Sequence, residues 1–528
     1  MRKLQLLVLL LFFGAFAEAQ DFSNKGKDFW LGYGYHCQMV NGTTGIAVST
    51  GGSQEMILYF TSDKAANVKV EIPAVGYTQN YTVTPGVVTV TTPIPKSGAQ
   101  DARIVDSGYF NRGIHVTSNE PIVAYAHIYN GSISGASLLF PTNTLGKEYY
   151  SVSYNQRSNQ AFSNSFFFVV ATEDNTTVEI TPSAANKNNI TAGTKKLVNL
   201  NKGEIYSVLG TTSGNIGTDL TGSVIRSISS ANGSCKPIAV FAGAGKISIG
   251  ASQTGSADNL FAQALPSNAW GLKYLTAPTG SQPNNYYRIC VKDPTTVVKL
   301  NGVVIPASLL QGNFFYEIKN STVLTTPGNG ISVPNNQSAF NLIEADKPIM
   351  VAQFCTTQGT DGNPNFGGSS GNNIGGDPEM IYLSPIEQTI SKITLYSASQ
   401  NAIIQSYINV IIKKEGVASF KLDGVNRASA FGVHPRDSDY SFAILSVNAG
   451  SHTLESDSGY NAIAYGFGNA ESYGYNAGTN VIDLNPPVKI TNEFSDASVN
   501  FSATCINSPF RVNLALTYQP QKIVVDFL

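Results

Sequence analysis

SNEPIVAYAHIY, residues 118–129, is an apolar run that the chain repeats. GSCKPIAVFAGAG (233–245) and EADKPIMVAQFC (344–355) resemble it closely, and a more divergent fourth copy, DSGYNAIAYGFG, occupies residues 457–468. The copies recur at intervals of about 115 residues, which indicates an internal repeat. Each copy is apolar over six or seven residues, as expected for a strand that is buried on both faces. We call it the PI strand and interpret it as core, because proline is tolerated at the first residue of a strand.

Other elements recur in the same order around the PI strand. The four units open on similar runs: GKDFWLGYGYH (26–36), GKEYYSVSYN (146–155), WGLKYLTAP (270–278) and SKITLYSAS (391–399). Each opening is followed by an apolar run, a polar turn and an alternating β-branched run. The turn carries Asp63, Asp174 or Asp293 in three units and Lys414-Glu415-Gly416 in the fourth. Two strand-like runs separated by a short polar turn predict a β-hairpin.

This pattern predicts an all-β fold. Six or seven strands in about 115 residues suit four tandem β-sandwich-like modules, followed by an incomplete C-terminal β domain. The alternative is a propeller-like closed arrangement, although four-stranded blades usually repeat at about 40–50 residues. We expect a signal peptide at 1–19, β modules at 20–137, 138–258, 259–380 and 381–479, and the start of a further Ig-like or β-sandwich domain, cut short, at 480–528.

The N-terminal segment has the features of a signal peptide. A basic start precedes an apolar stretch over residues 4–16, and the small residues Ala17 and Ala19 allow cleavage between Ala19 and Gln20. This stretch is shorter than the roughly 18 residues of a membrane-spanning helix. We therefore expect an exported chain that is secreted or held at the cell surface, without membrane insertion of the mature protein.

Charge and cysteine content narrow the classes of partner and scaffold. Charged residues make up 13 % of the chain and the net charge is −2, whereas about 25 % is typical. Nucleic acids and anionic membranes need a basic surface, so we exclude both as partners. Five cysteines are too few for a disulfide-built scaffold, and the odd number leaves at least one thiol without a partner in this chain. They are Cys37, Cys235, Cys290, Cys355 and Cys505.

The module order resembles a known family. GKDFW after the signal peptide, KPIAVFAGAGK, DNLFAQALPSNAWGLKYL and GDPEMIYLSPIEQTI are similar to the IgGFc-binding protein N-terminal domain family, in the form that Bacteroidota-type bacteria export as surface proteins. The resemblance covers about residues 24–478. It implies an extracellular binding or adhesion role without catalysis, and it supplies no catalytic residues. Antibody binding is not transferred to this chain.

The long loop from Gly359 to Glu379 is the main candidate for ligand binding. Loops longer than about 15 residues in a compact domain are often functional. Asp361, Asp377 and Glu379 in this loop are candidate calcium ligands, because calcium takes six to eight oxygen ligands, although their spacing matches no known calcium loop. The same loop contains a formal GxSxG at residues 367–371. It lacks the strand before and the helix after that a nucleophile elbow needs, so we interpret it as surface loop.

Two further patterns are interpreted as structural. The histidines lie in or beside strand-like runs and form no metal-type pair: His36, His115, His127, His434 and His452. The Tyr/Gly-rich runs 29–36 and 465–478 either stack on sugars or pack tyrosine against tyrosine in the core, where glycine lets backbones approach. We favour the core interpretation.

The leading functional hypothesis is a non-enzymatic exported protein for adhesion or recognition of an extracellular ligand, either a glycan, a mucin or another protein. No cofactor is expected apart from calcium. The first alternative is a structural stalk that projects a C-terminal domain. The second is an extracellular hydrolase that uses the 359–379 loop. Ligand identity, disulfide pairing, module arrangement and oligomeric state stay open from sequence alone.

Overall fold

The computed structural model describes residues 23–229, 235–250, 255–319, 324–326, 329–331, 340–367, 374–398, 403–484, 488–492 and 510–514. Within these ranges the chain consists of antiparallel strands joined by turns and short 3-10 segments, which confirms the all-β prediction. The predicted signal peptide lies outside the described residues. Of the predicted C-terminal domain, the structure describes one pair of strands, β36 (Val488–Asn492) and β37 (Phe510–Leu514).

One long strand organises the first module. Its sheet contains β1 (Gly26–Leu31), β2 (Glu55–Thr61), β3 (Ala66–Ile72), β4 (Tyr77–Val83), β5 (Thr89–Val90), β7 (Ile114–Tyr129) and β8 (Ser134–Leu138). The order is β4-β3-β7-β2-β5, and β1 and β8 also pair with β7. β1 and β3 pair with the first half of β7, whereas β2 and β8 pair with its second half. The PI strand is thus the second half of a strand that two groups of strands share.

In the second module, the corresponding strands form two separate sheets instead of one. Its strands are β9 (Glu148–Tyr150), β10 (Ser165–Ala171), β11 (Thr176–Thr181), β12 (Lys196–Leu200), β13 (Glu204–Leu209), β14 (Thr212–Ser213), β15 (Ile216–Gly217), β16 (Val224–Ile228), β17 (Ile238–Ile247) and β18 (Asp258–Gln263). One sheet is ordered β18-β17-β10-β13-β6 and the other β12-β11-β16-β9. β6 (Gly108–Asn111) comes from the segment predicted as the first module but pairs with β13.

The third and fourth modules again use one long strand each. The third contains β19 (Gly271–Thr276), β20 (Tyr286–Val291), β21 (Val298–Leu300), β22 (Val303–Val304), β23 (Phe315–Ile318), β24 (Leu324–Thr326), β25 (Asn329–Ile331), β26 (Asn341–Cys355) and β27 (Glu379–Tyr382). The fourth contains β28 (Ile390–Ser397), β29 (Ile403–Lys413), β30 (Lys421–Leu422), β31 (Val425–Asn426), β32 (Gly432–Val433), β33 (Tyr440–Val447), β34 (Gly450–Gly468) and β35 (Glu471–Gly478). β26 and β34 take the place of β7.

Short 3-10 segments join these strands. They are Cys37–Met39, Pro73–Val75, Gly98–Gln100, Thr142–Thr144, Ser267–Ala269, Ala307–Leu309, Lys414–Ser419 and Ala428–Ala430. The strand that follows each PI strand pairs back onto it, so β18 pairs with β17 and β27 with β26. The module boundaries proposed from the sequence stay predictions.

The PI strands are core, as predicted. Residues 122–128 of β7 and 349–355 of β26 are buried throughout. The glycine that opens three of the repeat units also has a structural reason. A Cβ on Gly26 would lie 2.2 Å from a side-chain carbon of Pro141, and one on Gly271 would lie 2.3 Å from Pro385. Each of these opening strands therefore starts in contact with a proline, which follows β8 in one case and β27 in the other. Only glycine leaves room for that contact.

The predicted hairpins at the aspartate turns are wrong. β2 and β3, which flank Asp63, do not pair with each other; both pair with β7, at residues 123–129 and 115–118 respectively. β10 and β11 lie in different sheets. A polar turn of this composition serves a hairpin and a change of sheet equally well. The hairpins lie one strand later, where β3 pairs with β4 and β11 with β12.

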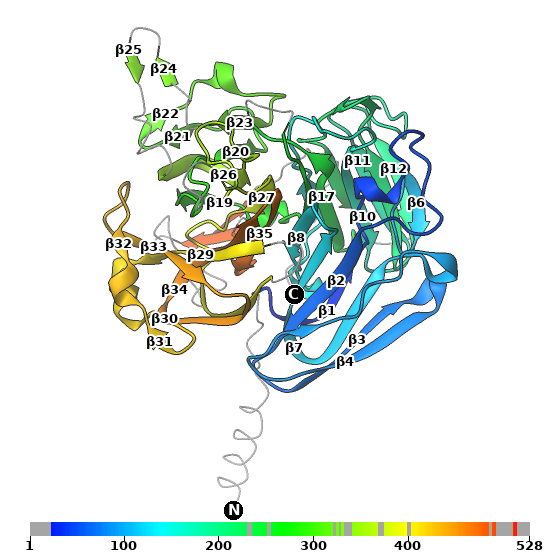
Figure 1. Cartoon of the computed structure of the whole chain (residues 1–528). Helices are drawn as coiled ribbons and strands as arrows, with labels where there is room; N and C mark the ends of the chain where they lie inside the picture. Colours follow the sequence, from blue (N-terminus) through cyan, green and yellow to red (C-terminus); the bar gives the residue numbers. More distant parts are fainter. Residues whose placement is uncertain are drawn as a thin grey trace, which may run out of the picture.

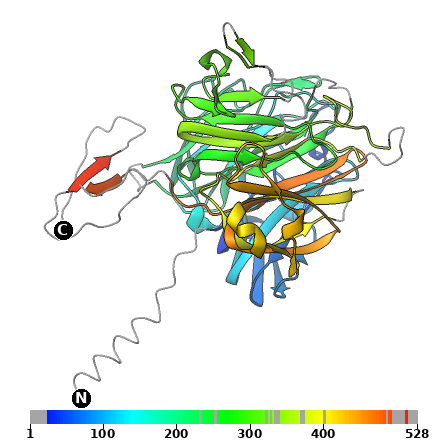
Figure 2. The same ribbon diagram turned by 90° about the vertical axis from the view of Figure 1, so that its left-hand side faces the viewer.

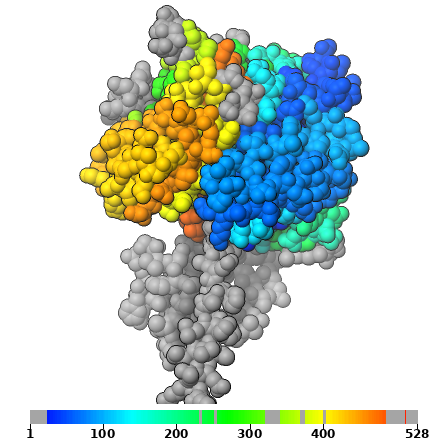
Figure 3. All heavy atoms as spheres, turned by 60° about the horizontal axis from the view of Figure 1, so that its bottom comes forward, coloured from blue at the N-terminus to red at the C-terminus, as the bar shows by residue number. Residues whose placement is uncertain are grey.

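The four modules close into a ring (Figure 1). β8 lies against β18 and β35, and β27 lies against the same two strands, so the four inner strands surround a common axis. The first and last modules meet through direct hydrogen bonds: Asn24 N donates to Thr479 O, and Thr479 N donates to Asn24 Oδ1, both at 3.0 Å. These two modules lie side by side in Figure 3, blue and orange. The structure therefore has the closed arrangement that was the alternative from sequence.

The inner strands are joined by side chains. Gln263 of β18 accepts a hydrogen bond from Phe140 N at 2.8 Å through Oε1, and its own N donates to Ser137 Oγ at 2.8 Å. On the other side of the axis, Asn476 of β35 donates to Tyr382 O at 3.0 Å. These polar side chains thus form hydrogen bonds with buried backbone groups at the edges of the inner strands, where no neighbouring strand supplies a backbone partner.

The four cysteines in the described ranges are free thiols. Cys37, Cys290 and Cys355 are buried, whereas Cys235 is partly exposed. Burial raises the pKa of Cys37 to about 12, and it raises the pKa values of Cys290 and Cys355 as well. Because the thiolate is the reactive form, these three side chains should be inert in the folded protein.

A thiol-reagent assay checks this assignment. In a Cys235→Ser/Cys505→Ser variant, we expect no reaction with a water-soluble disulfide reagent under native conditions and three reacting thiols after denaturation. The wild type is the matched control for reagent access at Cys235. Rapid labelling of the folded variant would contradict the buried placement of these thiols.

Candidate functional site

The ring has two different ends. The inner strands finish near Asn24 and Thr479, and we call this end the terminal face. They begin at the opposite end, the loop face, which carries the connections before β8, β18, β27 and β35. Figure 2 shows the ring from the side, with β36 and β37 projecting on one side of it. The loop from Gly359 to Glu379 precedes β27 and therefore belongs to the loop face.

The first part of this loop is anchored to its own module and to the second module. Asn363 Nδ2 donates to Asn284 O at 3.0 Å and to Thr356 Oγ1 at 2.6 Å, and Asn284 N donates to Asn363 Oδ1 at 3.0 Å. Thr357 N donates to Ile249 O of the second module at 2.8 Å. The loop thus has a fixed base, and a surface that includes Asp361 and Asn365 is exposed. Residues 368–371 of the formal GxSxG lie outside the described residues.

The three calcium candidates are not grouped together. Asp361 is exposed and lies beside the Tyr286 hydroxyl, whose pKa is raised chiefly by burial and further by this carboxylate. Asp377 and Glu379 are buried, with at most 1 % of either side chain exposed. They lie at the ring axis, where the structure adds Asp258 and Glu471, two carboxylates that sequence reasoning did not select.

These buried carboxylates occupy the starts of the inner strands. Asp258, Glu379 and Glu471 are the first residues of β18, β27 and β35, and Ser134 is the first residue of β8. Asp377 lies two residues before β27. We call Asp258, Asp377, Glu379 and Glu471 the axial cluster. Each repeat therefore places a polar residue at the same point of its inner strand, and that repetition is the sequence signal that could have found the cluster.

Serine side chains and backbone amides hold the axial cluster. Ser134 N donates to Asp258 Oδ1, while Ser472 N and Oγ donate to Asp258 Oδ2, both at 3.2 Å. Ser472 Oγ also donates to Asp377 O at 2.9 Å, and Ser256 Oγ donates to Asp377 Oδ1. Within the described residues, Asp377 Oδ2, Glu379 Oε1 and both oxygens of Glu471 have no hydrogen-bond partner.

Burial and mutual repulsion favour the neutral form of these carboxyls. Burial raises the pKa of Asp377 to about 7, although the Ser256 hydroxyl and the Lys246 ammonium oppose the shift. Burial raises the pKa of Glu471 to about 8, and the charge of Asp377 adds to it. The pKa values of Asp258 and Glu379 are also well above normal, first through burial and then through the neighbouring carboxylates. The axial cluster therefore keeps protons near neutral pH.

The axial cluster is closed to solvent in this structure. Across the described ranges, no three histidine, cysteine or acidic side chains converge closely enough to hold a metal ion. Calcium at Asp361, Asp377 and Glu379 thus stays a prediction. Since the four carboxyls are at most 1 % exposed, a polymeric substrate cannot reach them in this conformation.

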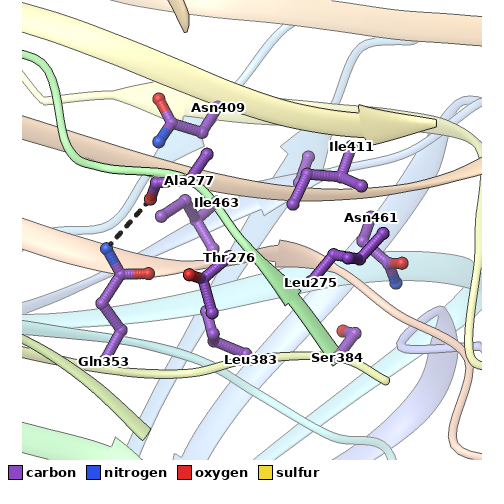
Figure 4. A pocket seen from close by; sticks show the side chains of 11 residues that line it. Leu275, Thr276, Ala277, Gln353, Leu383, Ser384, Asn409, Ile411, Asn461 and Ile463 are labelled. Atoms are coloured by element: carbon purple, nitrogen blue, oxygen red, sulfur yellow. Dashed lines mark hydrogen bonds between the residues drawn. The ribbon is translucent and has the colours of Figure 1, made fainter. Parts of the chain in front are cut away.

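The best-defined cavity is also too small for a ligand. It lies between the third and fourth modules and has a volume of about 30 Å³, room for about one water molecule. Figure 4 shows Gln353, Asn409 and Asn461 around it, with Gln353 Nε2 donating to Ala277 O at 3.4 Å. We interpret it as a hydrated gap between modules.

The other sequence candidates have structural partners. His115 hydrogen-bonds to Asp28 at 2.7 Å and stacks on Trp30, and His434 bonds to Thr276 O at 3.0 Å. The Tyr/Gly-rich run 465–478 forms the end of β34 and all of β35, where Tyr473 and Tyr475 are buried. The core interpretation of this run is confirmed.

A closed all-β body whose long loops gather on one face is the architecture of proteins that bind through loops on a rigid scaffold. The family described as IgGFc binding protein matches residues 135–466, more than half of the chain, and the chain belongs to this family. No curated protein matches it. In the described residues, no helix combines the length and the apolar character needed to cross a membrane.

Proposed function

We propose that the chain is an exported, non-enzymatic recognition protein that binds an extracellular glycan, mucin or protein. Family membership supports a binding role. Export and a place in the extracellular space or at the cell surface follow from the predicted signal peptide. The likeness to Bacteroidota-type surface proteins, seen in the sequence motifs, supports the same setting. No cofactor is required for this function, with calcium as the one candidate.

The observation that carries the proposal is the position of the two chain ends. Ser23 pairs with Asn480 in an isolated β-bridge, so the chain enters and leaves the ring at the terminal face. The loop face, at the other end of the axis, is left for a ligand. Its loops come from all modules, and loops of neighbouring modules are joined by hydrogen bonds, as Thr357 of the third module is to Ile249 of the second. A rigid base below exposed loops favours binding without a large loss of conformational entropy.

The same observation counts against a structural stalk. A spacer gains length when its modules are stacked end to end and its two ends lie at opposite poles. Here the first and fourth modules contact each other, for example through Tyr59 and Tyr396, whose ring centroids lie 4.6 Å apart. A hydrolase is disfavoured in turn by the complete burial of the axial cluster.

A binding screen tests the proposal. The secreted chain from Gln20 onward is applied to arrays of glycans, mucins and extracellular proteins, with calcium and with a chelator. We expect saturable binding to at least one ligand. Substitution of the exposed loop residues, as Asp361→Ser/Asn365→Ser, should weaken binding by about tenfold if they contribute to the interface centre.

The matched control is Asp457→Ser, which removes an exposed carboxylate from β34 of the fourth module. It should leave binding at the loop face unchanged. If no ligand on the three arrays shows saturable binding, the recognition function is refuted and the structural-stalk alternative is favoured. Binding that disappears with the chelator would make calcium part of the site.

A further inference from the structure

Tyr109 is the one exposed aromatic side chain among those whose burial the structure describes. It is 60 % exposed, whereas both tryptophans and the other phenylalanines and tyrosines of this set are buried or partly buried. Among these described side chains, the aromatic rings lie in or against the core with a single exception. In the free protein, an exposed aromatic ring does not gain the free energy that burial of its apolar surface would provide. The exception therefore needs a reason.

The ring of Tyr109 is held in a fixed position. Tyr109 lies in β6, an edge strand at the outer side of the second module (Figure 1), and is directly opposite Tyr206 of β13. The two ring centroids are 4.8 Å apart at an interplanar angle of 74°. Tyr206 is buried, and its hydroxyl accepts a hydrogen bond from Asn188 Nδ2 at 3.2 Å. This edge-to-face contact with a buried ring restricts the position of Tyr109, which stays 60 % exposed.

Polar side chains surround this ring. Glu204 and Asn111 form the cross-strand pair two positions along β6 and β13. Residues two apart in a strand project from the same face, so both flank Tyr109. The Glu204 carboxylate is close enough to help raise the pKa of the Tyr109 hydroxyl, after burial and Tyr206. Nearby, Lys187 and Asp106 form an ion pair at 2.5 Å. The platform thus combines one aromatic face with hydrogen-bonding groups at its rim.

We propose that Tyr109 and the polar rim of Glu204, Asn111 and Asn188 form a saccharide-binding platform on the side of the ring. A sugar ring presents C–H groups on one face and hydroxyls at its edge. The C–H face packs on the negative face of the tyrosine ring, while the hydroxyls bond to carboxylate and amide groups beside it. This inference rests on the proposed recognition function and adds to it a second binding surface, separate from the loop face, with a named ligand class.

A protein partner fits this surface less well. A stable protein interface covers about 800 Å² on each partner and has an apolar centre. The neighbours of Tyr109 on its own face of this strand pair are instead Asn111 and Glu204. One ring with a polar rim matches the footprint of one or two sugar units.

The test uses the full secreted chain and a pool of oligosaccharides released from mucin. Tyr109→Ala should raise the dissociation constant by about tenfold or more, and Tyr109→Phe should leave it nearly unchanged, because stacking needs the ring and not the hydroxyl. Glu204→Gln should weaken binding to a smaller extent. The control Leu197→Ala removes another exposed apolar side chain of the same module, 54 % exposed, and should have no effect. Unchanged melting temperatures verify that the variants are folded.

A tryptophan reporter gives a direct readout of stacking. Trp30 and Trp270 are buried, with 3 % and 1 % of their surfaces exposed, so Tyr109→Trp adds the one accessible indole among described positions. We expect its emission to shift to shorter wavelength with the oligosaccharides and to become protected from acrylamide. If wild type and Tyr109→Ala bind oligosaccharides equally, the platform is refuted and the recognition function stands. If the wild type binds proteins alone, the saccharide assignment is refuted. If it binds no ligand of any class, both proposals fail.

Discussion

Replacing Arg288 by methionine should lower the free energy of unfolding by about 3–5 kcal/mol, the usual cost of removing one partner from a buried ion pair. Arg288 lies in β20 and is fully buried. Its guanidinium bonds to Asp219 at 2.7 Å and lies over the rings of Tyr154 and Phe315, 4.3 and 4.1 Å from their centroids. Asp219 and Tyr154 belong to the second module, so this contact joins two modules. Chemical denaturation of the wild type and the variant measures the loss.

Two further variants separate charge from shape. Arg288→Lys keeps the charge but lacks the planar group that bonds to Asp219, Thr221 Oγ1 and Ser153 O while stacking on two rings, so it should recover only part of the loss. Arg288→Met/Asp219→Asn should be more stable than Arg288→Met alone, because the Asp219 carboxylate is no longer left without its partner. Glu317, which lies 3.7 Å from Arg288, still pairs with Lys319 at 2.9 Å in this variant. A loss below about 1 kcal/mol for Arg288→Met would contradict the role of this pair as a junction.

Much of the strand content could be predicted because it depends on neighbours in the sequence. The apolar run from Ile122 to Ile128 indicates a doubly buried strand without reference to the rest of the chain. The turn at Asp63 shows the limit of this reasoning: its composition indicates a turn but does not say which strand β3 will pair with. Ring closure depends on the contact of Asn24 with Thr479, which are 455 residues apart. No local pattern contains that information.

The candidate site was predictable in part for the same reason. Asp377 and Glu379 were selected from a Gly- and Asn-rich loop, which is a local signal. Their partners Asp258 and Glu471 lie in other modules, and their pKa values depend on burial that only the assembled ring creates. The sequence around Tyr109, GYFN at residues 108–111, does not indicate that this side chain is exposed. Its exposure becomes unusual only when the other described aromatic residues are known to be buried.

The stability of the ring should fall as pH rises from about 6.5 to 8.5. Asp377 and Glu471 have ordinary pKa values of 3.8 and 4.5 in the unfolded chain and about 7 and 8 in the folded one. In this window the folded state binds protons that the unfolded state has released, so each rise in pH favours unfolding. The two groups together predict a loss of about 2–3 kcal/mol. Urea titrations at a series of pH values measure it.

Other groups act at lower pH. Burial lowers the pKa values of His36 and His127 to about 3, so these side chains destabilise the folded state as pH falls below about 6.5. Pairing with Arg226 holds the pKa of Glu148 below its usual range against burial, and that contribution is lost below about pH 4. The window from 6.5 to 8.5 therefore isolates the axial cluster from the histidines and from the surface ion pairs.

Neutral variants separate proton binding from calcium binding at the axis. Asp377→Asn/Glu471→Gln keeps the shape of both side chains and should be more stable than the wild type at pH 8.5, with a flatter profile, because neither position can form a buried charge and only Asp258 and Glu379 of the axial cluster still titrate. The control Asp361→Asn changes an exposed carboxylate and should reproduce the wild-type slope. A profile that rises from pH 6.5 to 8.5 would contradict the protonated state. If calcium restores the wild type at pH 8.5 but not the double variant, the cation replaces the protons, and Asp377 becomes a calcium ligand as its loop first suggested.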